Sequence, residues 1–334
     1  MIQSYVLLIV GFVLLVTGGD YLIKGGSRLS ALLGVSPLLI GLGIAAFGTS
    51  APEAAVSIKA AVSGHSAVSI GNILGSNIAN IGLAVGLSLL LFGIKGNHRK
   101  LWKEISFGFA ATLLLLFLCI TPFSRKGEYG LNHIGGYILL FFFAGYLFHL
   151  FRMSRSDKKK TQNETTNHIK NRLLEYVKSI VMTLGGIAGV IFGGSFVVDH
   201  AVLIAASWGV SQTLISVTIV ALGTSLPEIV VSVIAVRKNH WDMALGNILG
   251  SNLFNILFVL GTTATIRSME FSNFNRLVLP DLFIALGITL MLYLFIMRKG
   301  KTADTLKRSR MHGAILLLTY TAYIAFAILR PQLI

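Results

Sequence analysis

The sequence predicts an all-α integral membrane protein with ten transmembrane helices in two inverted five-helix repeats, in which helices 2 and 7 are broken. Three observations lead to this fold class: an apolar composition, one polar segment near the middle of the chain, and two motifs that recur 175 positions apart. Of the 334 residues, 54% are hydrophobic and only 12% are charged, and the mean hydropathy is +0.78. Soluble domains carry about 25% charged residues, so this chain is far more apolar than they are.

Ten apolar stretches are each long enough to cross the bilayer as a helix, which takes about 20 residues. In chain order they cover residues 4–33, 36–62, 67–93, 101–121, 131–151, 177–207, 211–236, 243–265, 278–297 and 311–330. The charge-dense segment 152–174 lacks periodic apolar residues and reads as a linker. It separates a first five-helix repeat, residues 1–151, from a second one, residues 175–334. Because five is an odd number, the second repeat must enter the bilayer from the opposite face.

The basic residues alternate from loop to loop. Six of the 28 Lys and Arg residues fall on one side of the predicted membrane, namely Lys59, Arg125, Lys126, Arg267, Arg276 and Arg330. The remaining 22 fall on the other side, so the positive-inside rule makes that side cytoplasmic, together with the linker, and places both termini outside. The net charge of +15 therefore indicates orientation in the cell membrane rather than binding of nucleic acid. The lipid bilayer is the expected partner, and no obligatory protein partner is evident.

The first repeated motif places a carboxylate inside a predicted span. Gly48-Thr49-Ser50-Ala51-Pro52-Glu53 recurs as Gly223-Thr224-Ser225-Leu226-Pro227-Glu228. Each proline lacks a backbone donor and crowds the carbonyl four residues earlier, so the helix should break just before it. An ionisable side chain at membrane depth costs about 2.5 to 3.5 kcal/mol on insertion scales, which makes a functional site its default interpretation. A purely structural role is disfavoured because both acids recur in the same polar surroundings.

The second repeated motif gives the next helix of each repeat a polar stripe at positions i, i+4 and i+8, on one helix face. The stripe consists of Asn72, Ser76 and Asn80 in the first repeat and of Asn247, Ser251 and Asn255 in the second. For Asn72 and Asn247, a ligand role and a structural role both stay open. Asn77 and Asn252 lie one position off the stripe and are expected to bond helices together. GxxxG pairs at Gly71/Gly75 and Gly246/Gly250 allow close helix approach.

Together the motifs supply carboxylates, amides, hydroxyls and opened main-chain carbonyls, with no thiol and no histidine. Such oxygen ligands suit Ca²⁺ better than Zn²⁺ or Cu²⁺, and two carboxylates balance the charge of one divalent ion. The same oxygens could hold Na⁺ or take up protons after calcium leaves, which is the competition that an antiporter needs. A cation channel stays open as another class. An enzyme is disfavoured because hydrolysis needs a nucleophile beside a base such as His or Lys, and no cofactor is indicated besides the transported ions.

These motifs resemble the two alpha repeats of the calcium:cation antiporter superfamily, in particular its prokaryotic sodium/calcium exchanger group. The pattern GTSxPE followed by GNxxGSNxxN occurs twice and is highly specific, with repeats at about 41–90 and 216–265. The resemblance implies four ion-liganding helices in a diamond-like core and sliding of helices 1 and 6 to alternate access. It also implies Ca²⁺ binding by Glu53 and Glu228. The Na⁺ and Ca²⁺ ligands it implies are Thr49, Ser50, Thr224 and Ser225, with Ser76, Asn80, Ser251, Asn255 and the carbonyls near Ala46 and Ala221 lining the remaining sites.

Two differences between this chain and other superfamily members indicate which ion drives transport. Some superfamily members carry an acid at one of the positions held here by Asn80 and Asn255, and a Glu-Asn-Glu-Asn centre is similar to that of proton/calcium exchangers. Those proton exchangers, however, usually have an acid where this chain has Ser76 and Ser251. The sequence therefore favours extrusion of Ca²⁺ in exchange for Na⁺, and a proton/calcium exchanger that uses the same carboxylates is the alternative.

Two further features lie outside the motifs. Asp20 and Lys24 are four residues apart, which predicts a local ion pair on one helix. His65 and His240 coincide in the repeat and fall at loop ends, where a solvated histidine is the common case and a pH sensor the alternative.

Overall fold

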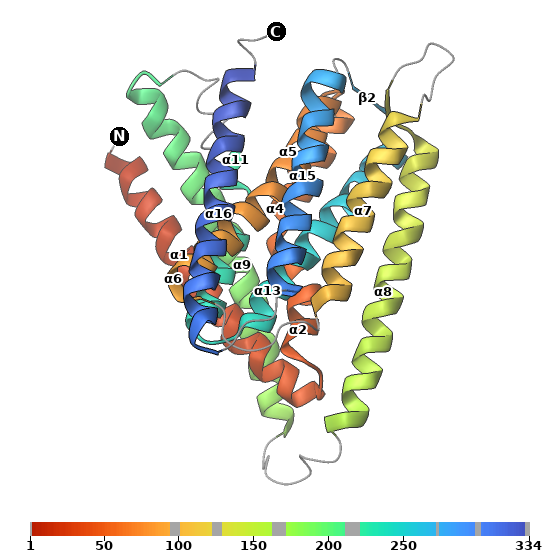
Figure 1. Cartoon of the computed structure of the whole chain (residues 1–334). Helices are drawn as coiled ribbons and strands as arrows, with labels where there is room; N and C mark the ends of the chain where they lie inside the picture. The colour runs from red at the N-terminus through yellow and green to blue at the C-terminus, as the bar shows by residue number, and fades with distance from the viewer. Residues whose placement is uncertain are drawn as a thin grey trace. The chain divides into compact units, whose positions relative to one another are not determined.

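The computed structural model describes residues 2–93, 101–121, 129–161, 172–210, 221–271, 274–297 and 302–330 (Figure 1). These residues are nearly all helical, and eight of the helices within them are long and apolar enough to cross a membrane. A bent helix pair, Pro37–Thr49 and Ala51–Val62, raises the number to nine. The predicted stretch 211–236 lies partly outside the described residues, because its first ten positions are not among them.

Contacts divide the chain into two units. Unit 1 comprises Met1–Thr49 and Tyr146–Gly250, and unit 2 comprises Ser50–Gly145 and Ser251–Ile334. Two of the divisions fall inside the repeated motifs, between Thr49 and Ser50 and between Gly250 and Ser251. Each unit therefore receives residues from both halves of the sequence.

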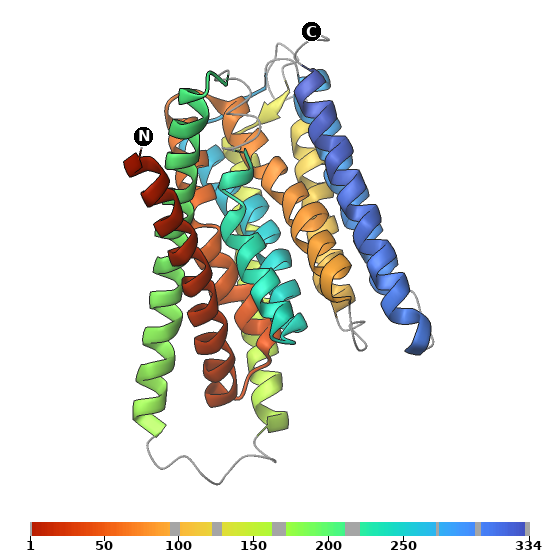
Figure 2. The ribbon, with the colours of Figure 1, turned by 90° about the vertical axis from the view of Figure 1, so that its left-hand side faces the viewer.

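The most extensive helix contact in unit 1 is between α1 (Ile2–Leu33) and α9 (Arg172–Ser207), which lie side by side in both views (Figures 1 and 2). Glycines seven residues apart on α1 meet the backbone of α9. An added Cβ would lie 2.9 Å from the nitrogen of Val197 at Gly11, 2.7 Å from that of Val190 at Gly18, and 2.7 Å from that of Thr183 at Gly25. Each step of seven residues along α1 matches a step of seven back along α9, so the helices are antiparallel. Small residues at the contact let the two backbones approach closely.

The remaining described elements of unit 1 are short helical segments on either side of the motifs. They are α2 (Pro37–Ile40), the π-helical turn η1 (Gly41–Ala45), α3 (Ala46–Thr49), α11 (Ala221–Gly223), α12 (Leu226–Arg237) and α13 (Trp241–Leu253). The Tyr146 hydroxyl donates to the carbonyl of Leu42 in the π-helical turn at 3.1 Å. This bond satisfies a main-chain oxygen that an irregular helix would otherwise leave open at membrane depth.

Unit 2 is built mainly from helices that follow the motifs. They are α4 (Ala51–Val62), α5 (Ser66–Ala79), η2 (Asn80–Val85), α6 (Gly86–Phe92), α7 (Trp102–Ile120), η5 (Phe254–Leu260), α14 (Gly261–Ile266), α15 (Phe274–Met297) and α16 (Thr302–Leu329). Here α16 packs on η2 and α6, while α15 packs on α5 and α7. A two-stranded antiparallel ladder pairs β1 (Gly130–Leu131) with β2 (Met269–Glu270). The helix α8 (His133–Thr161) contributes to both units and runs beyond the predicted stretch 131–151.

Of the two GxxxG pairs, which allow close helix approach, only the second makes close contacts in the described structure. In unit 1 an added Cβ at Gly246 would lie 2.7 Å from the Leu38 carbonyl, and one at Gly250 would lie 2.8 Å from the Ala46 Cβ. A Cβ at Gly71, in contrast, would meet nothing within 4 Å among the described residues, and one at Gly75 would meet only the Tyr323 hydroxyl at 3.8 Å. Neither glycine of the first pair therefore makes a close contact with the backbone of another described helix.

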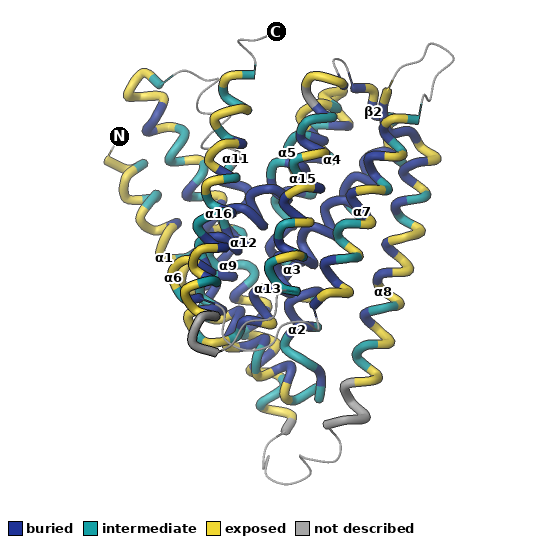
Figure 3. The backbone as a smooth tube through the Cα atoms, viewed as in Figure 1, coloured by how far each residue is buried: buried dark blue, intermediate teal, exposed yellow. Residues whose placement is uncertain are grey.

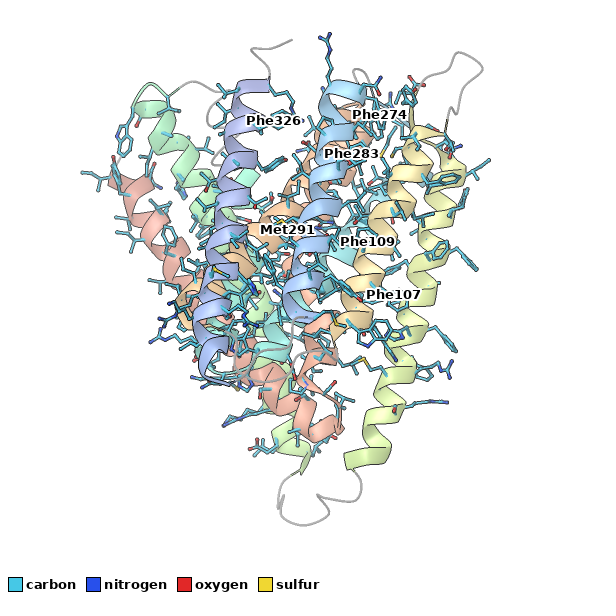
Figure 4. The ribbon with its side chains drawn as sticks, viewed as in Figure 1. Phe107, Phe109, Phe274, Phe283, Met291 and Phe326 are labelled. Atoms are coloured by element: carbon cyan, nitrogen blue, oxygen red, sulfur yellow. The ribbon has the colours of Figure 1, made fainter. Side chains whose placement is uncertain are left out.

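Burial separates the spans that carry the second motif from the rest (Figure 3). The most apolar windows of Ser66–Phe92 and Trp241–Ile266 are 78% and 94% buried, whereas no other span exceeds 47%. The outer helices instead expose large apolar side chains, among them Phe107 on α7, Phe283 on α15 and Phe326 on α16 (Figure 4). Exposed apolar side chains on long apolar helices are what a lipid-facing surface requires.

Candidate cation-binding residues

The first motif interrupts a helix in both repeats. The segments Pro37–Thr49 and Ala51–Val62 meet at an angle of 47°. In the second repeat α11 ends at Gly223 and α12 begins at Leu226. Pro52 and Pro227 stand in the first turn of the new helix, where a missing N–H breaks no helical hydrogen bond. The interruptions lie where the prolines predict them.

Each interruption is followed by a buried acid. Glu53 lies in the first turn of α4 and Glu228 in the first turn of α12, and both residues are 0% exposed. Backbone N–H groups of a first turn have no helical acceptor, and the helix dipole places partial positive charge there. Both effects stabilise a negative charge that burial would otherwise penalise. The local fold therefore supports a carboxylate at each position.

In unit 2, Glu53 has hydroxyl and amide neighbours on α5. The Ser76 hydroxyl donates to Glu53 Oε1 in a long hydrogen bond of 3.4 Å. Asn72 Nδ2 donates to Ser57 Oγ at 3.0 Å and to the main-chain oxygen of Glu53 at 3.4 Å. Of the predicted residues, the structure thus brings Glu53 and Ser76 together, and Ser50 and Ser251 are fully buried in the same unit.

Unit 1 contains the matching arrangement from the second repeat. Asn247 Nδ2 donates to Ser232 Oγ at 3.2 Å, the counterpart of the Asn72–Ser57 bond 175 positions earlier. The Thr49 hydroxyl lies 3.2 Å from Asn247 Oδ1 and 3.3 Å from the Ala46 carbonyl, both of them acceptors. The Ala46 oxygen, expected as a ligand, therefore already has a donor nearby.

Three more predicted residues of unit 1 are also buried, namely Thr224, Ser225 and Glu228. The Ser225 hydroxyl has no hydrogen-bond partner among the residues that the structure describes. A buried hydroxyl without a partner costs free energy, so a ligand for this oxygen is favoured. The backbone of Ala221 begins α11, and its side chain lies outside the described part of the chain.

The Ser57 and Ser232 hydroxyls belong to neither motif and were missed by the sequence prediction. Each stands four residues after the acid of its repeat, hence on the same helix face, and the two are 175 positions apart. That spacing is the signal that could have identified them. Both are fully buried. Ser57 accepts a hydrogen bond from Asn72 Nδ2, and Ser232 accepts one from Asn247 Nδ2. These bonds give Asn72 and Asn247 a structural contact to the helix that carries the acid.

The predicted lining residues Asn80 and Asn255 lie in unit 2 and are 0% exposed. Asn80 Nδ2 donates to Asn252 Oδ1 and Asn255 Nδ2 donates to Asn77 Oδ1, each at 3.0 Å. The expected interhelical role of Asn77 and Asn252 is confirmed by these bonds.

The charged groups outside the motifs fall in separate places. The predicted ion pair of Asp20 with Lys24 is present at 2.7 Å, and Asp20 also pairs with Lys238, just beyond α12. His65 is exposed, whereas His240 is half-buried. The described ranges contain no cluster of three or more His, Cys, Asp or Glu side chains that could hold a metal ion. Glu53 and Glu228 therefore belong to no such cluster.

The chain matches the family described as sodium/calcium exchanger protein over residues 3–152 and 178–329. It is 35% identical to CaxA of Alkalimonas amylolytica over 327 residues, which cover 97% of this chain and 98% of that relative. It is 31% identical to the sodium/calcium exchanger MaX1 of Methanosarcina acetivorans over 348 residues, with 96% and 97% covered.

Solved structures are similar over the same length. The sodium-calcium exchanger NCX_Mj soaked with 2.5 mM Na⁺ and 0.1 mM Ca²⁺ superposes with a TM-score of 0.77 at 30% identity, covering 97% of this chain and 98% of that one. The same exchanger soaked with 10 mM Na⁺ and 10 mM Sr²⁺ gives a TM-score of 0.78 over the same shares of both chains.

Proposed function

On the premise that the chain belongs to the sodium/calcium exchanger family, we propose that it is a secondary antiporter that extrudes Ca²⁺ in exchange for Na⁺ by alternating access. Members of this family are multi-pass membrane transporters rather than enzymes. MaX1 is named a sodium/calcium exchanger, and NCX_Mj has been soaked with Na⁺, Ca²⁺ and Sr²⁺. These relatives support both ions as substrates.

The proposed topology has ten spans in two inverted repeats, residues 1–151 and 175–334, with both termini outside and the linker 152–174 cytoplasmic. Eight apolar helices and one bent pair among the described residues account for nine spans. The proposed tenth span is residues 211–236, whose first ten positions lie outside the described residues and which includes α11 and nearly all of α12. The loop asymmetry of Lys and Arg supports this orientation.

The proposed ligands follow the repeat. Glu53, Glu228, Thr49 and Thr224 would bind Ca²⁺. Na⁺ and Ca²⁺ would both use these four residues. The further ligands for both ions would be Ser50, Ser225, Ser76, Asn80, Ser251, Asn255 and the main-chain carbonyls near Ala46 and Ala221. One observation carries the proposal: each repeat buries one carboxylate at a helix start, and the helix that carries it is joined to the polar stripe by the same amide–hydroxyl hydrogen bond, Asn72–Ser57 or Asn247–Ser232.

This ligand chemistry explains how one set of groups could serve two ions. Carboxylate, hydroxyl and amide oxygens are the ligands that Ca²⁺ takes in flexible geometry. Two carboxylates balance one Ca²⁺, and the same charge could be balanced by Na⁺ after calcium leaves. Because the two ions would compete for the same oxygens, entry of one would favour release of the other. No resident cofactor or protein partner enters this proposal.

A proton-driven exchanger is the second candidate, favoured by the neutral amides at Asn80 and Asn255. With only two acids in the ligand set, protonation of Glu53 and Glu228 would neutralise it completely. The proton exchanger and the sodium exchanger share their ligands and differ in which gradient drives calcium.

Purified protein in lipid vesicles distinguishes these candidates. Vesicles loaded with Na⁺ are diluted into Na⁺-free medium that contains ⁴⁵Ca²⁺, and matched vesicles receive a pH gradient instead. We expect calcium uptake that follows the Na⁺ gradient and stops when a sodium ionophore dissipates it. Uptake driven only by the pH gradient would identify the proton exchanger. Calcium movement that ignores both gradients would contradict antiport and indicate a channel.

A further inference from the structure

Four asparagine side chains of unit 2 form one buried hydrogen-bonded cluster, which we call the asparagine network: Asn77, Asn80, Asn252 and Asn255. Each bond within it occurs twice, once in each direction between the repeats. Asn77 Nδ2 donates to the Asn252 carbonyl and Asn252 Nδ2 to the Asn77 carbonyl, both at 3.2 Å. Asn80 Nδ2 donates to Asn252 Oδ1 and Asn255 Nδ2 to Asn77 Oδ1, both at 3.0 Å.

The two main-chain carbonyls fix the orientation of every amide in the network. A carbonyl oxygen can only accept, so the atom of Asn252 that approaches the Asn77 carbonyl must be its nitrogen. The other end of the Asn252 amide is then an oxygen, and the atom of Asn80 that approaches it must be a nitrogen. The remaining atom of Asn80 is therefore Oδ1. The same steps from the Asn252 carbonyl through Asn77 assign Oδ1 as the remaining atom of Asn255.

These two remaining oxygens are the unsatisfied atoms of the network. Asn80 Oδ1 and Asn255 Oδ1 are buried, and neither has a hydrogen-bond donor among the residues that the structure describes. The other amide atoms of the network are all bonded. A buried acceptor without a donor is costly, and its recurrence at repeat-related positions indicates that these oxygens serve a ligand that is itself positive.

We propose that Asn77 and Asn252 are positioning residues, which hold the amide oxygens of Asn255 and Asn80 toward the transported cation and turn the amide N–H groups away from it. This inference rests on the proposed function, because it concerns cation binding by Asn80 and Asn255. An amide oxygen is a Ca²⁺ ligand, whereas an N–H group in its place would direct positive charge at the ion. Groups that orient metal ligands are typically worth about 10- to 100-fold in metal affinity.

The first test measures Ca²⁺ affinity of the purified full chain by isothermal titration or ⁴⁵Ca²⁺ filter binding. Asn252→Leu removes the acceptor that holds Asn80, so we expect affinity to fall by about 10- to 100-fold. Asn77→Leu removes the acceptor that holds Asn255 and should weaken binding to a similar extent. A folded Asn252→Leu or Asn77→Leu protein that binds Ca²⁺ as tightly as wild type would overturn the proposal, so the test stands even if one of the two variants fails to fold.

A matched control separates orientation from the loss of any buried asparagine. Asn132 is also buried in unit 2, where its Oδ1 accepts from the Gly135 backbone nitrogen near the start of α8. Asn132→Leu therefore removes a buried hydrogen bond away from the network. We expect its Ca²⁺ affinity to equal that of wild type even if its thermal stability falls. An equal loss of affinity in Asn132→Leu and Asn252→Leu would contradict a positioning role.

A double variant gives a readout that a structural role would not produce. Asn80→Asp replaces the amide by a group with two oxygens, whose binding no longer depends on which end faces the ion. In this background Asn252→Leu should cause no further loss of Ca²⁺ affinity. The same fold loss in the Asn80→Asp background as in wild type would overturn the positioning role. If wild type itself shows no Ca²⁺ binding and no gradient-driven flux, the proposed function fails instead.

Discussion

Single buried side chains at the candidate site differ in what they can offer a cation. Glu53 and Glu228 bring charge, whereas Asn80 and Asn255 bring neutral oxygens whose direction is set by neighbouring amides. Ser57, in contrast, accepts a hydrogen bond from the Asn72 amide and so links the polar stripe to the helix that carries the acid. The contribution of each residue follows from the atoms that remain after its structural hydrogen bonds are made.

His240 provides a prediction about pH at the residue scale. It lies between α12 and α13, and burial, followed by the charge of Lys238, lowers its pKa below the ordinary value of 6.5. The folded protein therefore binds this proton less readily than the unfolded chain does. The stability contributed by neutral His240 is present above pH 6.5 and is lost as pH falls through the lowered pKa.

Thermal unfolding in detergent, recorded between about pH 8 and pH 5, tests this prediction. We expect His240→Gln to lose less stability on acidification than wild type, because the variant has no proton to take up at this position. His65→Gln, which alters the exposed histidine at the repeat-related position, should keep the wild-type pH dependence. A wild-type pH dependence in His240→Gln would refute the assignment.

Residue-level prediction from the sequence succeeds where a residue recurs in a motif and fails where its role depends on a partner. The acids and the polar stripe were identified because the same residues recur at a spacing of 175. Ser57 and Ser232 share that spacing but stand outside the motifs, and a serine on an apolar helix has no distinctive pattern of its own. The direction of the Asn80 amide could not be predicted, because it depends on the side chain of Asn252, on a helix far along the chain.

At the scale of elements, the antiparallel pair α1 and α9 depends on backbone contact between glycines. A Cβ on Gly186 would collide with the backbone of Leu22, and its neighbour Gly185 would meet nothing within 4 Å among the described residues. The two positions are adjacent on one helix and differ only in the face they occupy. They provide a matched pair of glycine-to-alanine substitutions.

Gly186→Ala should destabilise the protein by about 1 to 3 kcal/mol, because a methyl group forced into a packed contact shifts one helix away from the other. Gly185→Ala should leave stability unchanged or raise it slightly, since alanine favours helix over glycine. Thermal unfolding midpoints of the two variants in the same detergent measure the difference. Equal midpoints would show that α1 and α9 do not pack through this glycine face.

Prediction of elements from the sequence located the spans well and their packing partners poorly. Hydropathy located eight of the described helices to within a few residues at most of their ends, with extensions into polar sequence at α8, α9 and α16. The GxxxG pairs allow close contacts in both repeats, yet a Cβ added at Gly71 would meet no side chain or backbone within 4 Å in the described structure. A small residue permits close approach but does not supply the neighbour.

At the scale of the whole molecule, composition, loop charge and duplication together indicated a membrane transporter, and the repeated motifs indicated an exchanger. The family match and the similar solved structures agree with that conclusion. The driving ion is the feature that sequence could least predict, because Na⁺ and H⁺ can use the same oxygens. Selectivity between them depends on the geometry and desolvation of those oxygens rather than on their identity.

The central claim is that each repeat supplies one carboxylate to the transported cation. It is tested most directly by Na⁺-gradient-driven ⁴⁵Ca²⁺ uptake into vesicles that contain wild type, Glu53→Gln, Glu228→Gln or the control Glu270→Gln, whose side chain is exposed. Removing one partner of a buried charge pair costs about 3 to 5 kcal/mol. We therefore expect uptake to fall about 100-fold or more in both Glu53→Gln and Glu228→Gln and to stay at the wild-type level in Glu270→Gln. Undiminished uptake in either Glu53→Gln or Glu228→Gln would contradict the claim.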